Sequence, residues 1–294
     1  MHLPVLKKKV IEYLDPKENE NFVDCTFGEG GHTKEILKKN KPEGKVLAIE
    51  IDPDLYEKGK ELEKKFKGRL ILKRGNFAEL KRIVKEEKFS PVNGILFDLG
   101  ISSWHLEKSQ RGFSFKRDEL LIMRYDKNLK DLTPIDVLNK FPEKEIEKIL
   151  KNYGQERFAK QIAKEIVKER KQKRIETAFQ LVQIIRKATP RWYQRRKIHF
   201  ATKTFLALRI FVNQELENLK EGLKQALEIL ERNGKIVVIS FHSLEDKIVK
   251  EFFKKAKKKG LLEILTKKPE TPSKEEIQKN KRARSAKLRA AKKL

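Results

Sequence analysis

The chain has 294 residues, 38% of them hydrophobic, which is enough to bury one large core or a core with an inserted domain. Its 70 Lys and Arg residues exceed its 43 Asp and Glu residues by 27, and this excess of positive charge indicates a polyanionic partner. No apolar run approaches the roughly 18 residues of a membrane span and no signal-like segment occurs, so we expect a soluble, cytoplasmic protein. The single cysteine, Cys25, excludes an internal disulfide and a cysteine-rich zinc site, and we expect no metal.

Short apolar runs alternate with helix-period segments along the first hundred residues. We predict strands over residues 22–26, 45–50, 70–73 and 92–97, and a fifth strand much later, over residues 235–241. Alternating strands and helices form right-handed βαβ units, because parallel strands need a crossover between them. The sequence therefore predicts an α/β fold with a doubly wound, mostly parallel sheet.

A glycine-rich turn lies where the first strand passes into a helix predicted over residues 33–39. Glycines at 28, 30 and 31 permit positive φ and let a ligand approach the backbone, while the first amides of the helix face the bound group. Glu50 ends the second strand, the position from which a carboxylate accepts hydrogen bonds from both ribose hydroxyls of an adenosine. Together these features predict a nucleoside-cofactor site.

The missing residues narrow the choice of cofactor. A dinucleotide fingerprint starting at Gly28 would need glycine where Thr33 stands, and no Gly-Lys-Ser/Thr phosphate loop occurs, so pyrophosphate binding is disfavoured. The spacing of Asp24, Gly28 and Gly30 is similar to the first motif of S-adenosylmethionine-dependent methyltransferases, in particular those acting on exocyclic amines of bases. An ordinary tight turn between strand and helix is the alternative.

The long segment between the fourth and fifth strands is too long for one crossover and predicts an inserted helical domain. Apolar stripes of helical period begin near Phe158 and near Phe179, both among Lys and Arg residues. We place the insertion at residues 106–198 and interpret it as an RNA-recognition domain. Residues 1–105 and 199–294 then form the discontinuous cofactor domain.

The chain returns to the sheet after the insertion. We predict two helices over 200–212 and 213–232 before the fifth strand, and a helix over 244–258 after it. The last two strands are expected at 262–265 and 286–290, separated by a mobile loop rich in Lys, Pro and Glu.

The segment after the fourth strand carries the candidate chemistry. This segment places a carboxylate, bare backbone and two hydroxyls at the carboxyl edge of the sheet, where doubly wound folds bind ligands. These groups belong to Asp98, Gly100, Ser102 and Ser103. The amino nitrogen of cytosine donates its lone pair into the ring, so acceptors on its hydrogens are needed to restore nucleophilicity. We assign Asp98 and Ser102 as catalytic candidates; for Asp98, cofactor binding or helix capping are alternatives.

Three further groups are candidates for RNA contacts. His242 ends the fifth strand, where Ser243 and Asp246 form a capping-box pattern. Arg111 and Phe113 combine a positive charge with an aromatic ring, a combination suited to stacking on an unpaired base. Packing in the core explains Phe113 equally well. The third group is the densest cluster of basic and aromatic residues in the chain, and it consists of Arg191, Trp192, Arg195 and Arg196. We interpret this cluster as an RNA contact; the alternative interpretation is a solvated helix end.

Taken together, these motifs resemble the family of bacterial small-subunit ribosomal RNA cytosine-N4 methyltransferases. The resemblance implies a Rossmann-like class I fold that binds S-adenosylmethionine and acts on one cytidine in the decoding region of 16S rRNA within the small subunit. The matching stretches are HLPVL at 2–6, DCTFGEGGHT at 24–33, DLGISS at 98–103, RGFSF at 111–115, YGQERFAKQIAKEIV at 153–167, ALRIFVNQEL at 207–216 and ISFHSLEDKIVK at 239–250.

The resemblance also implies the residues that contact the cofactor, with Phe77 against the adenine. The chain departs from the family at His105, where the family usually has Gln, and at Ile122, where the loss of an Asp argues against a catalytic acid in that loop. The cofactor contacts carried over by position are Gly30, Gly31, His32, Glu50, Phe77, Asp98 and His105.

Two other functions compete with this enzyme. A non-catalytic RNA-binding assembly factor would keep the fold without turnover, although the intact Glu50 and glycine turn argue against it. A DNA amine methyltransferase would normally carry Pro-Pro-Tyr or Pro-Pro-Phe after the fourth strand, where this chain has Leu99, Gly100 and Ile101.

Overall fold

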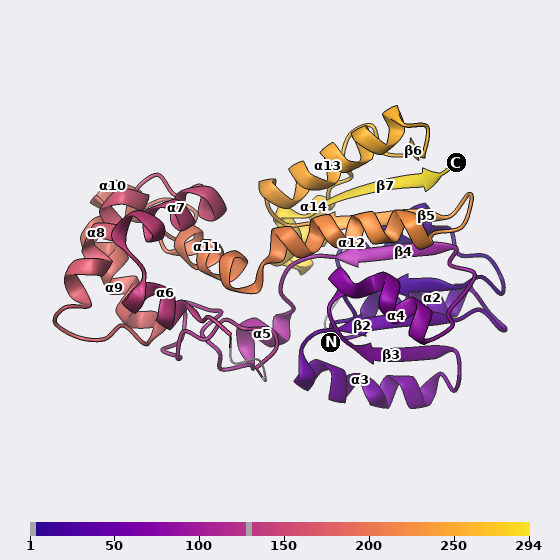
Figure 1. The fold of residues 1–294 in the computed structure, drawn as a ribbon, viewed down its shortest axis with the longest axis horizontal. Coiled ribbons are helices and arrows are strands. Elements are labelled where there is room, and N and C mark those ends of the chain that lie inside the picture. Colours follow the sequence, from indigo (N-terminus) through magenta and orange to yellow (C-terminus); the bar gives the residue numbers. More distant parts are fainter. Residues whose placement is uncertain (1–3, 128–130) are drawn as a thin grey trace. The chain divides into compact units, whose positions relative to one another are not determined.

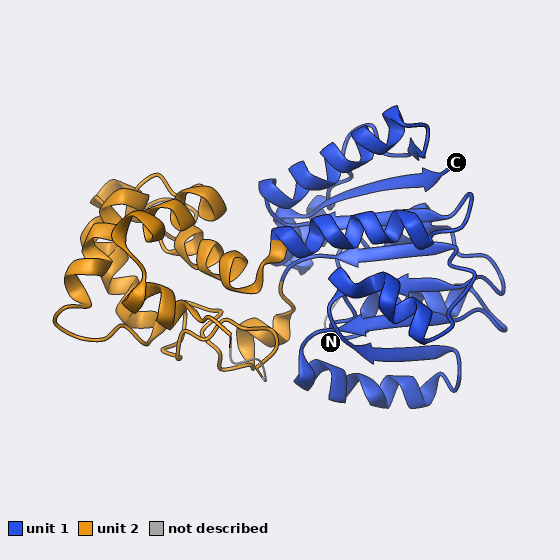
Figure 2. Cartoon of the chain, in the orientation of Figure 1, with its two compact units in different colours: residues 1–100, 216–294 blue, residues 101–215 orange. Residues whose placement is uncertain are grey.

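The computed structural model describes residues 4–127 and 131–294, so residues 2 and 3 of the HLPVL stretch lie outside the described part. The chain divides into two compact units (Figure 2). The first combines Met1–Gly100 with Leu216–Leu294, and the second is Ile101–Glu215. Each unit is described by itself below.

The described residues of the first unit form a seven-stranded sheet of order β3-β2-β1-β4-β5-β7-β6 (Figure 1). Strands β1 to β5 are parallel, whereas β7 pairs antiparallel with both β5 and β6. This is the mostly parallel, doubly wound sheet that the sequence predicted. The strands are β1 Phe22–Asp24, β2 Val46–Glu50, β3 Leu70–Arg74, β4 Gly94–Asp98, β5 Lys235–Ser240, β6 Leu262–Ile264 and β7 Lys287–Lys293.

Helices cover both faces of this sheet because successive strand residues point to opposite sides. On β4, Ile95 and Phe97 join one core with residues of α4, α12 and α13, while Leu96 joins the other with residues of α1 and α2. The helices of this unit are α1 Lys7–Leu14, α2 Gly31–Lys39, α3 Pro53–Lys65, α4 Leu80–Glu86, α12 Glu215–Ile229, α13 Ser243–Lys258 and α14 Lys274–Lys279, with 3-10 turns at Phe77–Glu79 and Lys281–Ser285.

The stretch between β6 and β7, which we predicted as a mobile loop, contains α14 and a 3-10 turn instead. Ser273 caps α14 by accepting a hydrogen bond from the Glu276 amide at 3.2 Å. The Glu276 carboxylate accepts one from the amide of Leu6 at 2.6 Å, and Ala283 is fully buried. That prediction was wrong because distant parts of the chain order a polar segment.

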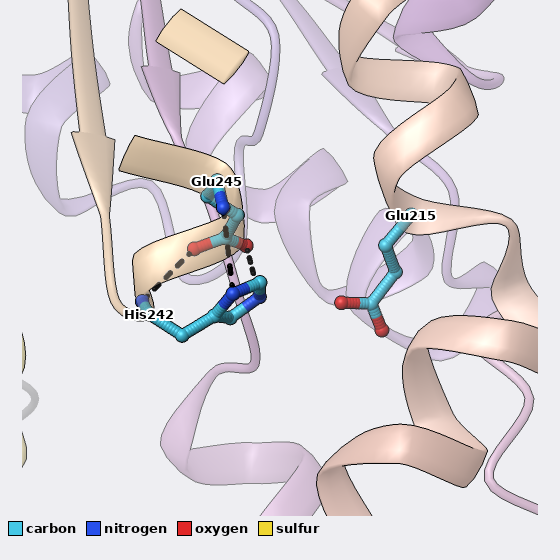
Figure 3. Close-up of side chains that lie close together, drawn as sticks. All are labelled: Glu215, His242 and Glu245. Carbon is cyan, nitrogen blue, oxygen red and sulfur yellow. Dashed lines mark hydrogen bonds and ion pairs between the residues drawn. The ribbon is translucent and has the colours of Figure 1, made fainter. Parts of the chain in front are cut away.

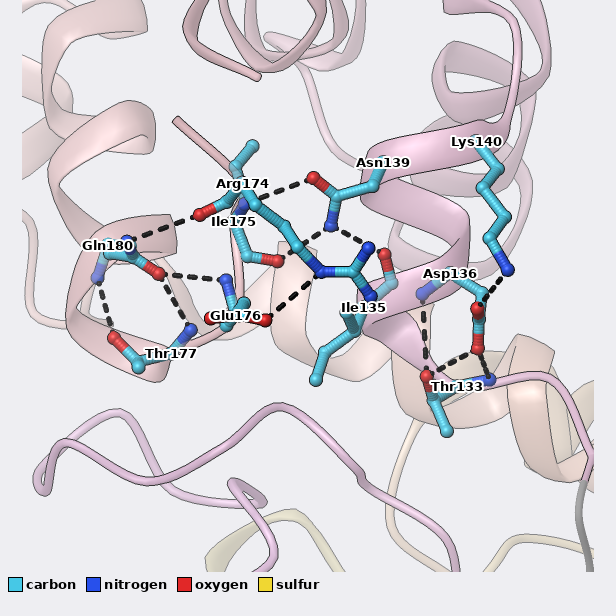
Figure 4. Close-up of polar contacts among 10 residues, drawn as sticks. All are labelled: Thr133, Ile135, Asp136, Asn139, Lys140, Arg174, Ile175, Glu176, Thr177 and Gln180. Carbon is cyan, nitrogen blue, oxygen red and sulfur yellow. Dashed lines mark hydrogen bonds and ion pairs between the residues drawn. The ribbon is translucent and has the colours of Figure 1, made fainter. Parts of the chain in front are cut away.

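The second unit surrounds one apolar core with helices in its described part. These are α5 Ser103–Glu107, α6 Pro134–Lys140, α7 Glu143–Gly154, α8 Ala159–Glu169, α9 Ala178–Ala188, α10 Arg191–Gln194 and α11 Thr202–Asn213. Two capping boxes begin α6 and α9, in which Thr133 and Thr177 exchange hydrogen bonds with Asp136 and Gln180 (Figure 4). Asn139 donates to the carbonyls of Ile135 and Ile175, both at 2.7 Å, and so ties α6 to the segment before α9.

The boundaries of the units differ from those that we placed at 105/106 and 198/199. Helix α11 packs on α7 within the second unit, because its buried residues Phe205 and Leu208 share a core with Ile146 and Leu150. The return to the sheet therefore begins with α12. No helix in the described ranges has the length and apolar character needed to cross a membrane.

Candidate cofactor site

The turn between β1 and α2 leaves backbone donors open to a ligand. Gly28 and Gly30 have φ of 56° and 72°, in the left-handed region that favours glycine. Gly30 is the N-cap of α2, and no side chain caps the helix there. The first amides of α2 therefore present donors, with the positive end of the helix dipole, to a polar ligand group.

A short polar network holds this turn against the end of β4. Asp24 accepts hydrogen bonds from the Thr26 amide at 3.1 Å and from the Thr33 hydroxyl at 2.6 Å. The Thr26 hydroxyl in turn accepts one from the Asp98 amide at 2.7 Å. Thr33, where a dinucleotide fingerprint would require glycine, thus has a structural use, and Thr26 joins the two loops.

We did not single out Thr26 in the sequence analysis. The sequence signal for its role is its position two residues after Asp24. Its hydrogen bond to Asp98 could not be predicted from that position, because it depends on the pairing of β1 with β4.

Buried His32 and partly buried Asp98 form a pair at the carboxyl edge of the sheet. The His32 residue is 5% exposed, and its Nε2 lies 3.4 Å from Asp98 Oδ2. Burial alone would lower the pKa of His32, but the adjacent Asp98 carboxylate outweighs that effect and raises it. His32 Nδ1 and Asp98 Oδ1 have no hydrogen-bond partner in the described chain, and His32 Nε2 has only its long 3.4 Å contact with Asp98. Buried polar atoms without partners are costly, so these atoms fit a site that a polar ligand completes.

Glu50 lies at the end of β2, as predicted, and is 6% exposed. Its Oε2 accepts a hydrogen bond from the Gly28 amide at 2.7 Å, and its Oε1 accepts one from the Asp52 amide at 2.8 Å. Burial raises the pKa of Glu50 to about 8, against the effect of these two donors. Each carboxylate oxygen keeps a further lone pair for a ribose hydroxyl.

Phe77 follows β3 and begins a 3-10 turn whose N-cap is Asn76. Its ring meets the ring of Phe97 edge-on, with centroids 5.5 Å apart. This contact holds the half-buried Phe77 ring in a fixed orientation, as a flat surface for an adenine requires.

Ser102 and His105 belong to the second unit, where they are bound to each other. Ser102 is the N-cap of α5, with its Oγ 2.9 Å from His105 Nδ1. The buried His105 ring packs edge-on against Trp104, Phe113 and Tyr125. The cap gives Ser102 a structural role, and its catalytic role and the cofactor contact of His105 stay predictions.

Arg111 and Phe113 both lie in the interior of the second unit. The Arg111 guanidinium donates to the carbonyls of Arg124 at 3.1 Å and Tyr125 at 2.8 Å. The Phe113 ring stacks on Tyr125 with centroids 5.5 Å apart. Both side chains are buried, so the packing alternative explains them and we leave them out of the proposed RNA surface. Arg191, Trp192, Arg195 and Arg196 are, in contrast, exposed.

His242 caps helix α13. The His242 and Glu245 side chains form the capping box, and His242 Nε2 lies 3.2 Å from Glu245 Oε1 (Figure 3). The predicted box of Ser243 and Asp246 was therefore displaced by one residue. Asp246 instead binds Arg289 of β7 at 2.7 Å. Glu215, also drawn in Figure 3, is the first residue of α12 and the last residue of the second unit, whereas the rest of α12 lies in the first unit.

The first unit thus has the fold of a Rossmann-like class I methyltransferase, with a nucleoside-cofactor turn at the expected edge of its sheet. The chain belongs to the MraW methylase family, whose sequence profile matches residues 1–294. This membership confirms the family resemblance, the methyltransferase class and S-adenosylmethionine as the cofactor.

Relatives match along the whole chain. The "Ribosomal RNA small subunit methyltransferase H" of Persephonella marina is 47% identical over 293 residues, covering 100% of this chain and 99% of the relative. The protein of the same name from Caldicellulosiruptor saccharolyticus is 47% identical over 308 residues with the same coverage. A solved rRNA methylase from Streptococcus thermophilus aligns with 100% of this chain and 99% of its own at a TM-score of 0.46 and 12% identity, which is too distant to bear on function.

Proposed function

We propose that this methyltransferase acts on the N4 amino group of one cytidine in the decoding region of 16S rRNA, in the small ribosomal subunit. The family resemblance implies that this cytidine is at position 1402. The observation that carries the proposal is the pair of buried His32 and partly buried Asp98, in which His32 Nδ1 and Asp98 Oδ1 have no hydrogen-bond partner in the described chain, at the edge of the sheet where a cofactor and a base would meet. The names of the full-length relatives support the RNA substrate. Such an enzyme works in the cytoplasm, where ribosomal subunits are found.

The proposed cofactor contacts are those that the family resemblance implies, and those in the first unit lie at or just after the carboxyl ends of strands β1 to β4. The backbone of Gly30, Gly31 and His32 would hold the polar tail of the cofactor, and Glu50 would hold the ribose hydroxyls. Phe77 would lie against the adenine. Asp98 would contact the cofactor from the end of β4, with His105 as the remaining contact.

The reaction needs an oriented amine more than a strong base. Bound S-adenosylmethionine supplies an electrophilic methyl group on a sulfonium sulfur. Transfer of that methyl group to N4 would break its bond to sulfur, and the proton leaving N4 would pass to solvent. The Asp98 carboxylate would accept a hydrogen bond from the amine and return its lone pair to the nitrogen, while Ser102, four residues later in the chain, would help to orient it.

A chain of formal net charge +27 suits this substrate. The exposed arginines Arg191, Arg195 and Arg196 would contact phosphates, and His242 would contact the base or a phosphate. The two alternatives differ from the proposal in their products: an assembly factor would form no methylated product, and a DNA methyltransferase would form methylated DNA.

The deciding experiment incubates the protein with methyl-labelled S-adenosylmethionine and small subunits that lack the modification, and then maps the labelled nucleoside. N4-methylcytidine at the proposed position is expected. Asp98→Asn removes the charge and keeps the size, so it should reduce labelling. Label in another base or in DNA would contradict the assigned target. If no substrate is labelled, the result would favour the non-catalytic assembly factor instead.

A further inference from the structure

The second unit carries an exposed tryptophan among arginines. The surface consists of Arg157, Arg191, Trp192, Arg195 and Arg196, and is called the Trp192 surface below. Trp192 lies in α10 and is 52% exposed. All four arginines are exposed as well, and the Arg157 guanidinium lies 5.3 Å from the centroid of the Trp192 ring. An exposed indole ring among guanidinium groups is the combination on which nucleic-acid bases stack.

Buried contacts hold this surface in place from below. The hydroxyl of Tyr193, next to Trp192, lies 2.8 and 2.9 Å from the two carboxylate oxygens of buried Glu156. Glu156 also accepts a hydrogen bond from the Phe158 amide at 2.9 Å. The Phe158 ring meets the rings of both Trp192 and Tyr193 edge-on. Because its neighbours are anchored, Trp192 presents its ring without a large loss of conformational freedom on binding.

The charge of the Trp192 surface is uncompensated within the described residues. None of its four arginines forms an ion pair there, whereas Lys168 and Lys187 elsewhere on this unit pair with Glu165 and Glu169. Such a surface is complementary to a single nucleic-acid strand, because a base can stack on the exposed aromatic ring and the anionic phosphates can contact the unpaired arginines.

We infer that the Trp192 surface binds an unpaired segment of RNA, with one base stacked on the Trp192 ring and the adjoining phosphates on the arginines. Both faces of a base inside a duplex are covered by neighbouring pairs, so a duplex meets only the charges. The inference rests on the proposed RNA substrate and specifies that the contacted part of that substrate is single-stranded.

Tryptophan fluorescence tests the stacking directly, because the chain has 2 tryptophans and Trp104 is buried. Trp104→Phe leaves Trp192 as the only tryptophan, so excitation that is selective for tryptophan reports on Trp192 alone. An oligouridylate of about 12 nucleotides should bind this variant and quench its emission, and an RNA duplex of the same length should bind more weakly with little quenching. Binding of both RNAs with equal affinity, or binding of the oligouridylate without quenching, would overturn the inference.

Substitutions separate stacking from charge. Trp192→Ala should weaken oligouridylate binding about tenfold and Trp192→Phe should recover most of it. Phe179→Ala, at a 44% exposed aromatic elsewhere on the same unit, is the matched control and should change nothing. Unchanged affinity of a folded Trp192→Ala protein would refute stacking.

The triple variant Arg191→Ala, Arg195→Ala, Arg196→Ala should flatten the slope of log affinity against log salt by about 2, while cofactor affinity stays constant. Lys144→Ala, Lys148→Ala, Lys151→Ala, on the exposed face of α7, is the control of equal charge change. If the salt slope flattens equally in both triple variants, the Trp192 surface contributes only nonspecific electrostatic attraction. The labelling of small subunits is a separate measurement, so the proposed function stands or falls independently of these results.

Discussion

Glu50 offers a test of the cofactor site that depends on pH. In the free protein its pKa is raised to about 8 by burial, so the carboxyl is mostly neutral at neutral pH. Two ribose hydroxyls donate best to an ionised carboxylate, and binding should therefore release a proton. At about pH 7, a group of pKa near 8 is about nine-tenths protonated, and close to one proton should be released per ligand bound.

The affinity for the nucleoside should rise about tenfold per pH unit as the pH approaches 8 from below, and should level off above it. The suitable probe is 5′-methylthioadenosine, which keeps the ribose and carries no amino-acid group that titrates in this range. Calorimetry in buffers of different ionisation enthalpy counts the released protons. Glu50→Ala should weaken binding by about 1 to 3 kcal/mol and abolish the proton release.

Glu29→Gln is the matched control, because Glu29 lies in the same turn but is exposed. It should leave affinity and proton release unchanged. Affinity that does not vary with pH and no proton release in the wild type would refute the raised pKa, and an unchanged affinity of Glu50→Ala would refute the ribose assignment.

The same carboxyl makes stability depend on pH. Its pKa is 4.5 when unperturbed and about 8 when folded, so the folded state binds more protons between these values. The free energy of unfolding should fall as pH rises through this window, by up to about 5 kcal/mol, and change no further above it. Glu50→Gln should remove that dependence while costing about 1 to 3 kcal/mol at low pH, where its amide group faces a backbone donor. Urea unfolding of both proteins at several pH values measures the difference.

Two further substitutions test other parts of the chain. Ser102→Ala should keep near-normal cofactor affinity but lower single-turnover methylation about tenfold, equivalent to about 1.4 kcal/mol, and an unchanged rate would confine Ser102 to capping α5. Asp246→Ala should lower the free energy of unfolding by about 3 to 5 kcal/mol, because it leaves Arg289 buried without its partner, and a loss below 1 kcal/mol in urea unfolding would contradict the pair's importance. Although burial opposes it, Arg289 holds the pKa of Asp246 below its usual value, so this contribution is present above about pH 4 and is lost as pH falls through the folded pKa.

The sequence by itself determined the features that depend on local pattern. Apolar runs predicted the sheet strands, and the glycines at 28 and 30 marked the turn with positive φ. Glu50 and Asp98 could be placed at strand ends because parallel strands all end at the same edge of the sheet. These inferences need only neighbours along the chain.

Tertiary structure alone decided features that depend on residues distant in sequence. Helix α11 joined the second unit because its apolar face meets α7, and polar segment 267–285 became ordered against the amino-terminal part of the chain. His242 replaces Ser243 as the cap because helix α13 begins at Ser243, one residue earlier than predicted. Arg111 became a buried support, since carbonyls more than ten residues away accept its hydrogen bonds. Hydrophobic periodicity records that a side chain is buried, but only packing identifies the partner it is buried against.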